Sequence, residues 1–215
     1  DLQEDDLIDR ASRAVQWCVA HGVTRIRSHV DTGSKMAVET MVAFKEEVAH
    51  LVDLQIVAFP QEGVFRGPHQ ASDLAWAAAA GVDCVGAIPH HEAHKKEGDD
   101  SVIFAFDLAE KHGLQVDLHC DESDDPMSQF LLTVCREKLR RSFENHVVAG
   151  HCTAMHSYSE IDAQNAISAV VESGVQVVAN PLDNVVLQGR GDTYPKRRGI
   201  TRIPELLAAG ANVGL

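Results

Sequence analysis

The sequence predicts an α/β fold in which parallel strands alternate with helices, and we interpret it as an incomplete (β/α)8 barrel. Seven apolar strand segments alternate with seven helical segments, at a spacing of roughly thirty residues, the length of a βα repeat. The strand segments are continuous apolar runs, which is typical of strands buried on both faces of a parallel sheet. Several helical segments end in a glycine that an apolar strand follows at once.

These signals place the elements in chain order. Helices are predicted over residues 5–20, 35–50, 70–80, 102–111, 127–143, 158–172 and 204–209. Five strands begin after the glycine that ends the preceding helix, at Gly22, Gly81, Gly113, Gly174 and Gly210. The other two strands, residues 54–59 and 146–149, are identified by their apolar runs alone. A doubly wound open sheet is the alternative, but it normally has a glycine-rich first turn that binds phosphate, and this sequence has none.

We expect the barrel to be incomplete at both ends. The chain opens on a helix with no strand before it, so the first strand is absent, and it stops at residues 212–215, within the predicted eighth strand. No Pro-, Gly- or Ser-rich linker divides the sequence, so residues 1–215 are predicted to form a single partial barrel domain. Such a barrel would leave two strand edges unpaired, and we therefore expect a homo-oligomer or a partner that completes it.

Composition and charge narrow the class of partner. The chain of 215 residues has 19 basic and 32 acidic residues, giving a formal charge of −13. This charge repels nucleic acid and anionic membranes, so a small neutral substrate is favoured over either. No window has the length of an apolar membrane span, and the first residues are acidic where a secretory signal would be basic and then apolar. We predict a cytoplasmic location.

The five cysteines form an odd set without a Cys-x-x-Cys pair, which argues against a disulfide framework and against a structural zinc site. We predict reduced thiols. Cys120 and Cys152 each follow a histidine that ends a predicted strand. Because neighbouring residues of a strand point to opposite faces, both are expected to pack away from a pocket that these histidines would line.

Two predicted strands end in histidine, and this pairing indicates a metal pocket. His119 closes one apolar run and Glu122 follows three residues later, while His151 closes the next run. A neutral histidine can bind a divalent metal, and a nearby carboxylate can move protons to and from water. In barrel enzymes the carboxyl ends of the strands form the active site. The alternatives are two unrelated buried histidines and a Glu122 that caps a helix or is a solvated carboxylate of the loop.

The roles of the individual residues follow from their chemistry. With a metal at His119, a water of lowered pKa would attack an electron-poor carbon, and Glu122 would carry the proton. His151 is either a second ligand or a hydrogen-bond donor that stabilises the attacking hydroxide, and the sequence does not choose. Gln61 offers a donor and an acceptor that match the O=C–N–H edge of a pyrimidine, or else it stabilises the turn before Gly63.

Other polar residues also follow predicted strands. His90 is expected to line the pocket and His91 and His94 to lie on the surface, because a histidine cluster without defined partners is weak support for a second metal. His29 and Asp31 end the first strand present and are expected at the pocket rim. A further polar run, residues 180–184, follows the strand after Gly174.

Four motifs give the chain a family resemblance. Residues 59–63, 119–122, 151–158 and 192–202 closely resemble the bacterial cytosine deaminases of the amidohydrolase superfamily, and the similarity runs through essentially the entire chain. The resemblance implies a distorted TIM barrel of the metal-dependent hydrolase type that binds one divalent metal, Fe2+ or Zn2+, and converts cytosine and water into uracil and ammonia. It also implies roles for four residues. These are metal ligation by His119, proton transfer by Glu122, orientation of the hydroxide by His151, and recognition of the pyrimidine edge by Gln61.

The chain departs from the family pattern in its ligands. Members carry a His-x-His pair on the first barrel strand and an Asp after the eighth, and neither is present here. A site with one of its four ligands should hold metal weakly, so we expect this segment alone to be inactive. The alternatives are a non-catalytic remnant or binding module, a related cyclic amidohydrolase acting on isocytosine, isoguanine or a triazine, and a barrel hydrolase of amide or ester bonds.

Overall fold

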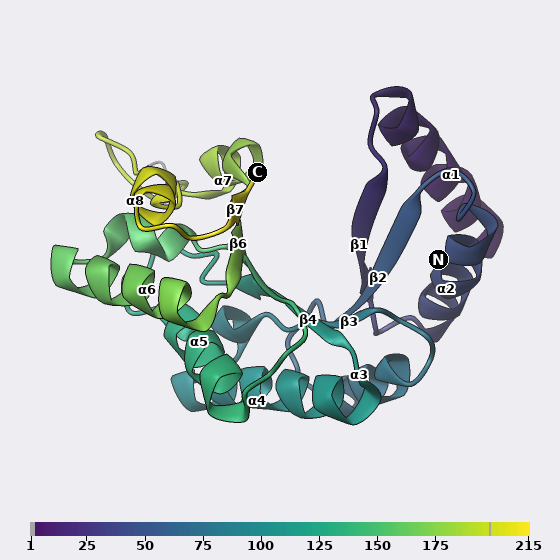
Figure 1. Ribbon diagram of the computed structural model, residues 1–215, viewed down its shortest axis with the longest axis horizontal. Coiled ribbons are helices and arrows are strands. Elements are labelled where there is room, and N and C mark those ends of the chain that lie inside the picture. The colour runs from purple at the N-terminus through teal and green to yellow at the C-terminus, as the bar shows by residue number, and fades with distance from the viewer. Residues whose placement is uncertain (1–2, 198) are drawn as a thin grey trace.

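A computed structural model describes residues 3–197 and 199–215 and shows one curled sheet wrapped by helices (Figure 1). Its seven strands are parallel, and each pairs with its neighbours in chain order. The strands are β1 (Arg25–Asp31), β2 (Asp53–Phe59), β3 (Cys84–Val85), β4 (Gln115–Cys120), β5 (Val147–His151), β6 (Gln176–Val178) and β7 (Val213–Gly214). The predicted α/β class is confirmed, and the unbroken strand order is that of a barrel because a doubly wound sheet would reverse it.

The helices lie mostly on the convex side of the sheet (Figure 1). They are α1 (Glu4–Ala20), α2 (Lys35–Glu47), α3 (Gln70–Ala78), α4 (Lys95–His112), α5 (Phe130–Arg141), α6 (Glu160–Ser173), α7 (Pro181–Leu187) and α8 (Ile203–Ala208). Two short 3-10 turns, η1 (Pro89–His91) and η2 (Thr153–Ser157), follow β3 and β5. Within the described residues, no helix combines the length and the apolar character that crossing a membrane requires.

The sheet is curled but open among the described residues. β1 and β7 stand at the two ends of the strand order, and they lie on opposite arms of the molecule in Figure 1. This half-barrel matches the incomplete (β/α)8 barrel that the sequence predicts. The concave side, which strands would enclose in a closed barrel, is therefore accessible.

Three elements differ most from the sequence predictions. α4 begins at Lys95 instead of residue 102, because two ion pairs at i,i+4 spacing, Lys95–Asp99 and Lys96–Asp100, support its polar first turns. α7 falls in a segment for which no helix is predicted, and it begins with Pro181, the residue whose fixed φ suits a first helical position. β3 pairs over only two residues.

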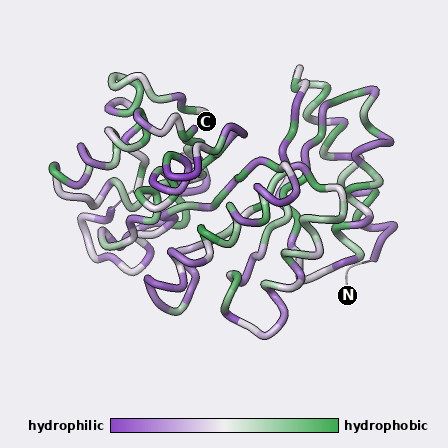
Figure 2. The backbone as a smooth tube through the Cα atoms, turned by 60° about the horizontal axis from the view of Figure 1, so that its bottom comes forward, coloured by the Kyte–Doolittle hydropathy of each residue, from purple (hydrophilic) through white to green (hydrophobic). Residues whose placement is uncertain are grey.

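The core lies between the convex face of the sheet and the helices. Each helix alternates hydrophobic and hydrophilic residues along its coil, as Figure 2 shows, because one side faces the sheet and the other faces solvent. The helix ends are those that the glycines predict: α4 and α6 stop at Gly113 and Gly174, whose φ values of 69° and 66° are left-handed. Each helix thereby returns the chain to the start of the next strand.

A substitution at Gly98 can test how α4 packs against α5. A Cβ at Gly98 would overlap the ring of Phe130 and lie 2.7 Å from the carbonyl oxygen of Pro89. We expect Gly98→Ala to lower the free energy of unfolding by about 1–3 kcal/mol, although alanine normally stabilises a helix relative to glycine. Chemical denaturation measures this, with Gly191→Ala as the control because nothing lies within 4 Å of a Cβ there. Equal stability of Gly98→Ala and wild type would contradict the packing.

Candidate metal and catalytic site

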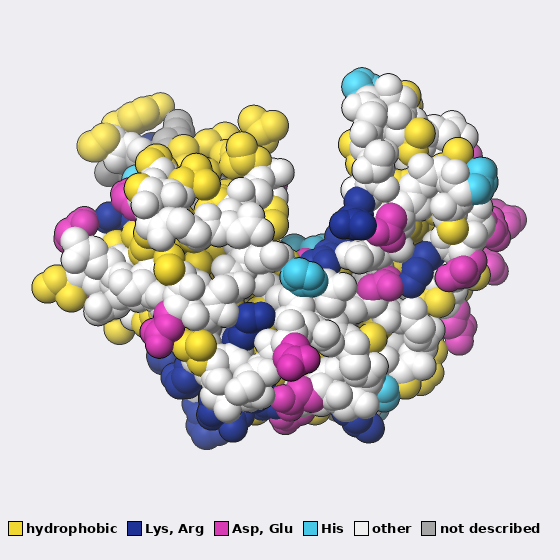
Figure 3. Space-filling model, in the orientation of Figure 1, with side chains coloured by type: hydrophobic (Ala, Val, Ile, Leu, Met, Phe, Trp, Pro, Cys, Tyr) yellow, Lys and Arg dark blue, Asp and Glu magenta, His cyan; other side chains and the backbone are white. Residues whose placement is uncertain are grey.

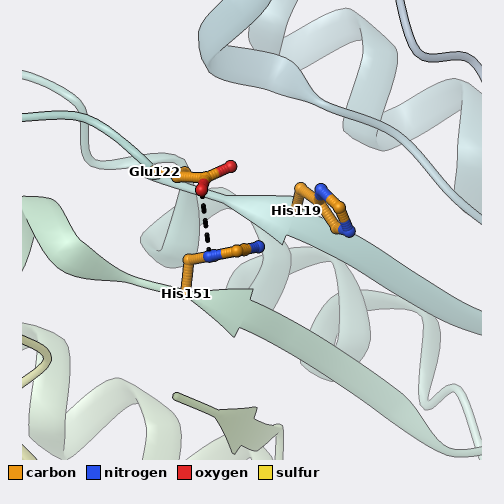
Figure 4. Close-up of side chains that lie close together, drawn as sticks. All are labelled: His119, Glu122 and His151. Atoms are coloured by element: carbon orange, nitrogen blue, oxygen red, sulfur yellow. Dashed lines mark ion pairs between the residues drawn. The ribbon is translucent and has the colours of Figure 1, made fainter. Parts of the chain in front are cut away.

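The carboxyl ends of β4 and β5 bring three predicted site residues together (Figure 4). His119 lies in β4, Glu122 follows the end of that strand, and His151 is the last residue of β5. Because β4 and β5 are adjacent and parallel, both strands end at the same edge of the sheet. One candidate ligand atom from each of the three side chains lies within 4.8 Å of the other two.

The contacts within this group are short. His151 Nδ1 lies 3.1 Å from Glu122 Oε1, and the ring centroids of His119 and His151 are 4.8 Å apart. His151 is 5% exposed, whereas His119 and Glu122 are half-buried. The arrangement therefore combines two imidazoles and one carboxylate at a partly desolvated surface, the donor set that Zn2+ and Fe2+ accept.

The fourth predicted residue, Gln61, is placed differently. It follows β2 at the same edge of the sheet, but its side chain is exposed and does not line the cavity that contains His119 and His151. Its predicted contact with a pyrimidine edge stays a prediction. The adjoining loop is held by Glu92, whose Oε1 accepts a hydrogen bond from Val64 N at 2.5 Å.

Asp121 shapes the turn that carries Glu122. Its backbone is left-handed, with φ of 51°, and its carboxylate is fully buried. Oδ1 accepts hydrogen bonds from Phe130 N at 2.9 Å and Ser128 Oγ at 2.8 Å, and Oδ2 accepts from Leu131 N at 2.9 Å. Asp121, and not Glu122, therefore binds the first amides of α5, which removes helix capping as the explanation of Glu122.

The end of β5 has the same kind of backbone. His151 and Cys152 have φ of 65° and 53°, a conformation that costs free energy in residues other than glycine and that clusters at functional sites. Cys152 N donates to Cys120 O at 2.8 Å, which joins the two strand ends directly. The Thr201 hydroxyl donates to the carbonyl oxygen of His151. The left-handed turns are thus held by contacts from other segments.

Burial shifts the protonation of these groups in opposite directions. Burial, together with the neighbouring His29 and His151, lowers the pKa of His119 to about 3, so the ring is neutral and has a lone pair for a metal. Burial raises the pKa of Glu122 to about 7, the charge of Asp183 acts in the same direction, and a hydrogen bond from Asn184 opposes it. A carboxyl group with this pKa can accept and release a proton near neutrality.

Asn184 belongs to this site, and the sequence did not single it out. It is 1% exposed, and its Nδ2 lies 3.3 Å from Glu122 Oε1 and 3.1 Å from His151 Nδ1. The one available signal was its place in the polar run 180–184 after a strand. That pattern marks the segment but not the residue, because α7 determines which side chain of the run turns toward β5.

The site opens into a cavity of about 760 Å³ on the concave side of the sheet. Figure 3 shows this hollow between the two arms of the molecule, with histidine and basic side chains near its floor. Asp117 joins the polar side chains along one wall of this cavity. Its carboxylate accepts a hydrogen bond from Arg27 Nη1 at 2.8 Å and lies 3.1 Å from His29 Nε2. The ring of His29 lies 4.6 Å from that of His119.

His29 therefore borders the pocket as expected, whereas Asp31 is exposed and does not belong to the residues that line it, so its rim position stays a prediction. His90, which is expected to line the pocket, lines smaller hollows instead of this cavity. Both its ring nitrogens are buried without a hydrogen-bond partner among the described residues. His91 and His94 are exposed, as predicted.

The cysteines are free, as predicted. Cys120 and Cys152 are fully buried and belong to the hydrophobic core, so neither thiol lines the pocket that contains the histidines. Burial raises the pKa of Cys84 and Cys135 to about 12. Thiols of this kind are inert packing groups and not nucleophiles.

The amino-acid sequence matches the model of the amidohydrolase family over residues 1–215. A pterin deaminase from Rhizobium rhizogenes (strain K84 / ATCC BAA-868) is 31% identical over 211 residues, which are 95% of this chain and 47% of that protein. An N-isopropylammelide isopropyl amidohydrolase from Pseudomonas sp. (strain ADP) is 26% identical over 200 residues, 91% of this chain and 46% of that protein.

The fold is also found in solved structures. The crystal structure of 5-methylcytosine deaminase from Klebsiella pneumoniae liganded with 5-fluorocytosine superposes with a TM-score of 0.96 at 40% sequence identity. The superposition covers 99% of this chain and 52% of that enzyme. The chain thus spans about half the length of the relatives that it matches.

Proposed function

Because the chain belongs to the amidohydrolase family, we propose that this protein deaminates cytosine or a closely related amino-heterocycle by metal-dependent hydrolysis. The observation that carries the proposal is the convergence of His119, Glu122 and His151, whose candidate ligand atoms lie within 4.8 Å of one another at two adjacent strand ends. The similar proteins named above are deaminases and an amidohydrolase, which supports the reaction class.

A divalent cation, Fe2+ or Zn2+, fits the donor set. His119 would hold it, because its ring is neutral and offers a nitrogen lone pair at the floor of the cavity. When bound, such a metal lowers the pKa of water and so supplies a nucleophile at neutral pH. Among the described residues, His119, Glu122 and His151 are the one group of side chains close enough together to share a metal ion. The other ligands of a four-coordinate site would therefore come from residues outside this group.

The protein's own residues would divide the remaining work. Glu122, with a pKa near 7, would take a proton from water and deliver it to the ring of the substrate. His151 would hydrogen bond to the attacking oxygen, because it faces Glu122 across 3.1 Å at the same strand edge. Gln61 would bind the O=C–N–H edge of the ring, a role supported by its amide chemistry and its place after β2.

The substrate class is tested by ammonia release from a panel of rings. Because residues 1–215 alone are expected to be inactive, the full product of the gene, loaded with Zn2+ or Fe2+, is assayed with cytosine, 5-methylcytosine, a pterin, isoguanine and an aminotriazine. Release from cytosine or 5-methylcytosine is expected. Release only from another ring would overturn the choice of substrate while leaving the reaction class. No release from any ring, with metal bound in stoichiometric amount, would overturn deamination and favour a binding module.

His119 is expected to control metal binding. Replacing His119 with Ala removes the neutral imidazole and should weaken metal affinity by at least about tenfold. Metal content after dialysis against a chelator of known affinity measures the change. His156→Ala is the matched control, because its ring is exposed outside the group. Equal metal content in the two variants would contradict the assignment of His119.

We further propose that residues 1–215 belong to a single barrel domain. We place the protein in the cytoplasm, where its buried thiols stay reduced. We also propose that it is a homo-oligomer. The oligomer is supported by the open curl of the sheet, whose end strands β1 and β7 pair on one side only among the described residues. Light scattering coupled to size exclusion tests it. We expect a mass above that of one chain, and a folded monomer at low concentration would contradict the expectation.

A further inference from the structure

The longest of the four sequence motifs, residues 192–202, lies in the segment between α7 and α8 (Figure 1), and none of the proposed chemical roles falls on it. The structure describes this motif as residues 192–197 and 199–202. Side chains from both parts reach the carboxyl ends of β4 and β5. These are the strand ends at which Glu122 and His151 lie.

Arg197 contacts the turn that follows β4. Its Nη1 donates a hydrogen bond to the carbonyl oxygen of Asp124 at 2.9 Å. Its Nε and Nη2 donate to the two carboxylate oxygens of Asp192 at 2.8 and 2.7 Å, a bidentate pair that fixes the plane of the guanidinium. Asp124 follows Glu122 by two residues. The contact with Arg197 therefore holds the turn that carries the proposed proton carrier.

A second contact to Asp124 comes from Gly189. The amide of Gly189 donates to Asp124 Oδ2 at 2.9 Å. Gly189 has a left-handed φ of 67°, and a Cβ at this position would lie 2.2 Å from the carbonyl oxygen of Arg197. The backbones of Gly189 and Arg197 are thus packed directly together, which requires glycine. Both hydrogen bonds to Asp124 come from this one packed loop.

Thr201 contacts the end of β5. It is 3% exposed, and its hydroxyl donates to the carbonyl oxygen of His151. His151 and Cys152 have left-handed φ values of 65° and 53°, which residues other than glycine adopt where surrounding contacts hold them. Arg202 fixes the neighbouring chain, because its Nε donates to the carbonyl oxygen of Met155 in η2 at 3.2 Å.

We infer that Arg197 and Thr201 are positioning residues that set Glu122 and His151 relative to each other. Neither belongs to the residues that line the cavity, so each acts through the backbone of a strand end. Glu122 Oε1 and His151 Nδ1 lie 3.1 Å apart, and a small displacement of either turn changes how the two groups meet a substrate. The effect on catalysis rests on the proposed deamination, whereas the contacts to the two turns do not.

Hydrogen–deuterium exchange tests these contacts without any substrate. The full product of the gene is compared with its Arg197→Met and Thr201→Val variants, which remove the donors and keep most of the side-chain volume. Each variant loses one hydrogen bond, so we expect exchange about two- to tenfold faster at the turn concerned. The affected amides should be those of residues 121–127 in Arg197→Met and 150–154 in Thr201→Val. Unchanged exchange at either turn would overturn the role of the residue that contacts it.

Two substitutions in the same segment are the matched controls. Arg190→Met removes a guanidinium whose Nε donates to the carbonyl oxygen of Val186 in α7. Thr193→Val removes an exposed hydroxyl. Both variants should leave exchange at the two turns at the wild-type rate. Faster exchange in the controls would show that any loss in this segment loosens the turns, and would contradict the specific assignment to Arg197 and Thr201.

Kinetics test the effect on catalysis once the ring panel identifies a substrate. Thr201→Val should lower kcat by about 10- to 10²-fold while KM changes little, because displacement of His151 affects the reaction more than the binding of the ring. Thr201→Ser keeps the hydroxyl and should restore kcat. Wild-type kcat in Thr201→Val, equal effects on kcat and KM, or no rescue by Ser would overturn the positioning role. If no ring is deaminated, the proposed function fails, and the exchange rates still decide whether these contacts hold the turns.

Discussion

Replacing Glu122 with Gln is expected to lower kcat for deamination by about 10² to 10⁴-fold. Gln has the shape of Glu and keeps an oxygen that Asn184 Nδ2 can reach, but it cannot take a proton from water or return one to the ring. Burial raises the pKa of the Glu122 carboxyl to about 7, so the native group exchanges protons at the pH where the substitution is tested. Steady-state ammonia release under saturating substrate measures the effect.

The loss should be confined to kcat. Metal content should stay at the wild-type level, because His119 is unchanged. Glu144→Gln is the matched control, since Glu144 is exposed in the turn before β5 and should leave kcat unaltered. If Glu122→Gln turned over substrate at the wild-type rate, the carboxyl would not be the proton carrier, and a water or another group in the cavity would have to take its place.

The fold was predictable because its signals are local. The helices that end at Gly113 and Gly174 stop where a left-handed residue is required, and the apolar runs that follow are strands buried on both faces. The early start of α4 was missed because polar residues support its first turn through ion pairs, and they carry no hydrophobic period. α7 was missed because Asn180-Pro181 looks like a loop unless Pro181 is taken as the first residue of a helix.

The sequence predicts those site residues that lie at the end of a strand. His119 and His151 end adjacent strands, so the parallel order alone brings them together. Asn184 could not be found in this way, because its contact with His151 depends on how α7 packs over β5 and not on spacing within a strand. Arg27 and Asp117, which form a polar wall beside the predicted His29, also escape pattern analysis, because a pair separated by 90 residues meets only when the sheet curls.

The largest effect on stability is expected at Asp121. Replacing Asp121 with Ala would leave the amides of Phe130 and Leu131 and the hydroxyl of Ser128 buried without their acceptor. An unsatisfied buried donor costs about 1–3 kcal/mol, so the free energy of unfolding should fall by about 2–5 kcal/mol. Asp121→Asn should lose less, because its single oxygen still accepts from Phe130 while its amide nitrogen faces another donor at Leu131.

Chemical denaturation of the variants measures these differences. Asp125→Ala is the matched control, because Asp125 is exposed and its loss of one hydrogen bond from Met127 N should cost less than about 1 kcal/mol. Asp121→Ala as stable as this control would contradict the role of the buried carboxylate. Because Glu122 follows Asp121 directly, the folded fraction of Asp121→Asn should also lose activity, which would link the support of α5 to the placement of the proton carrier.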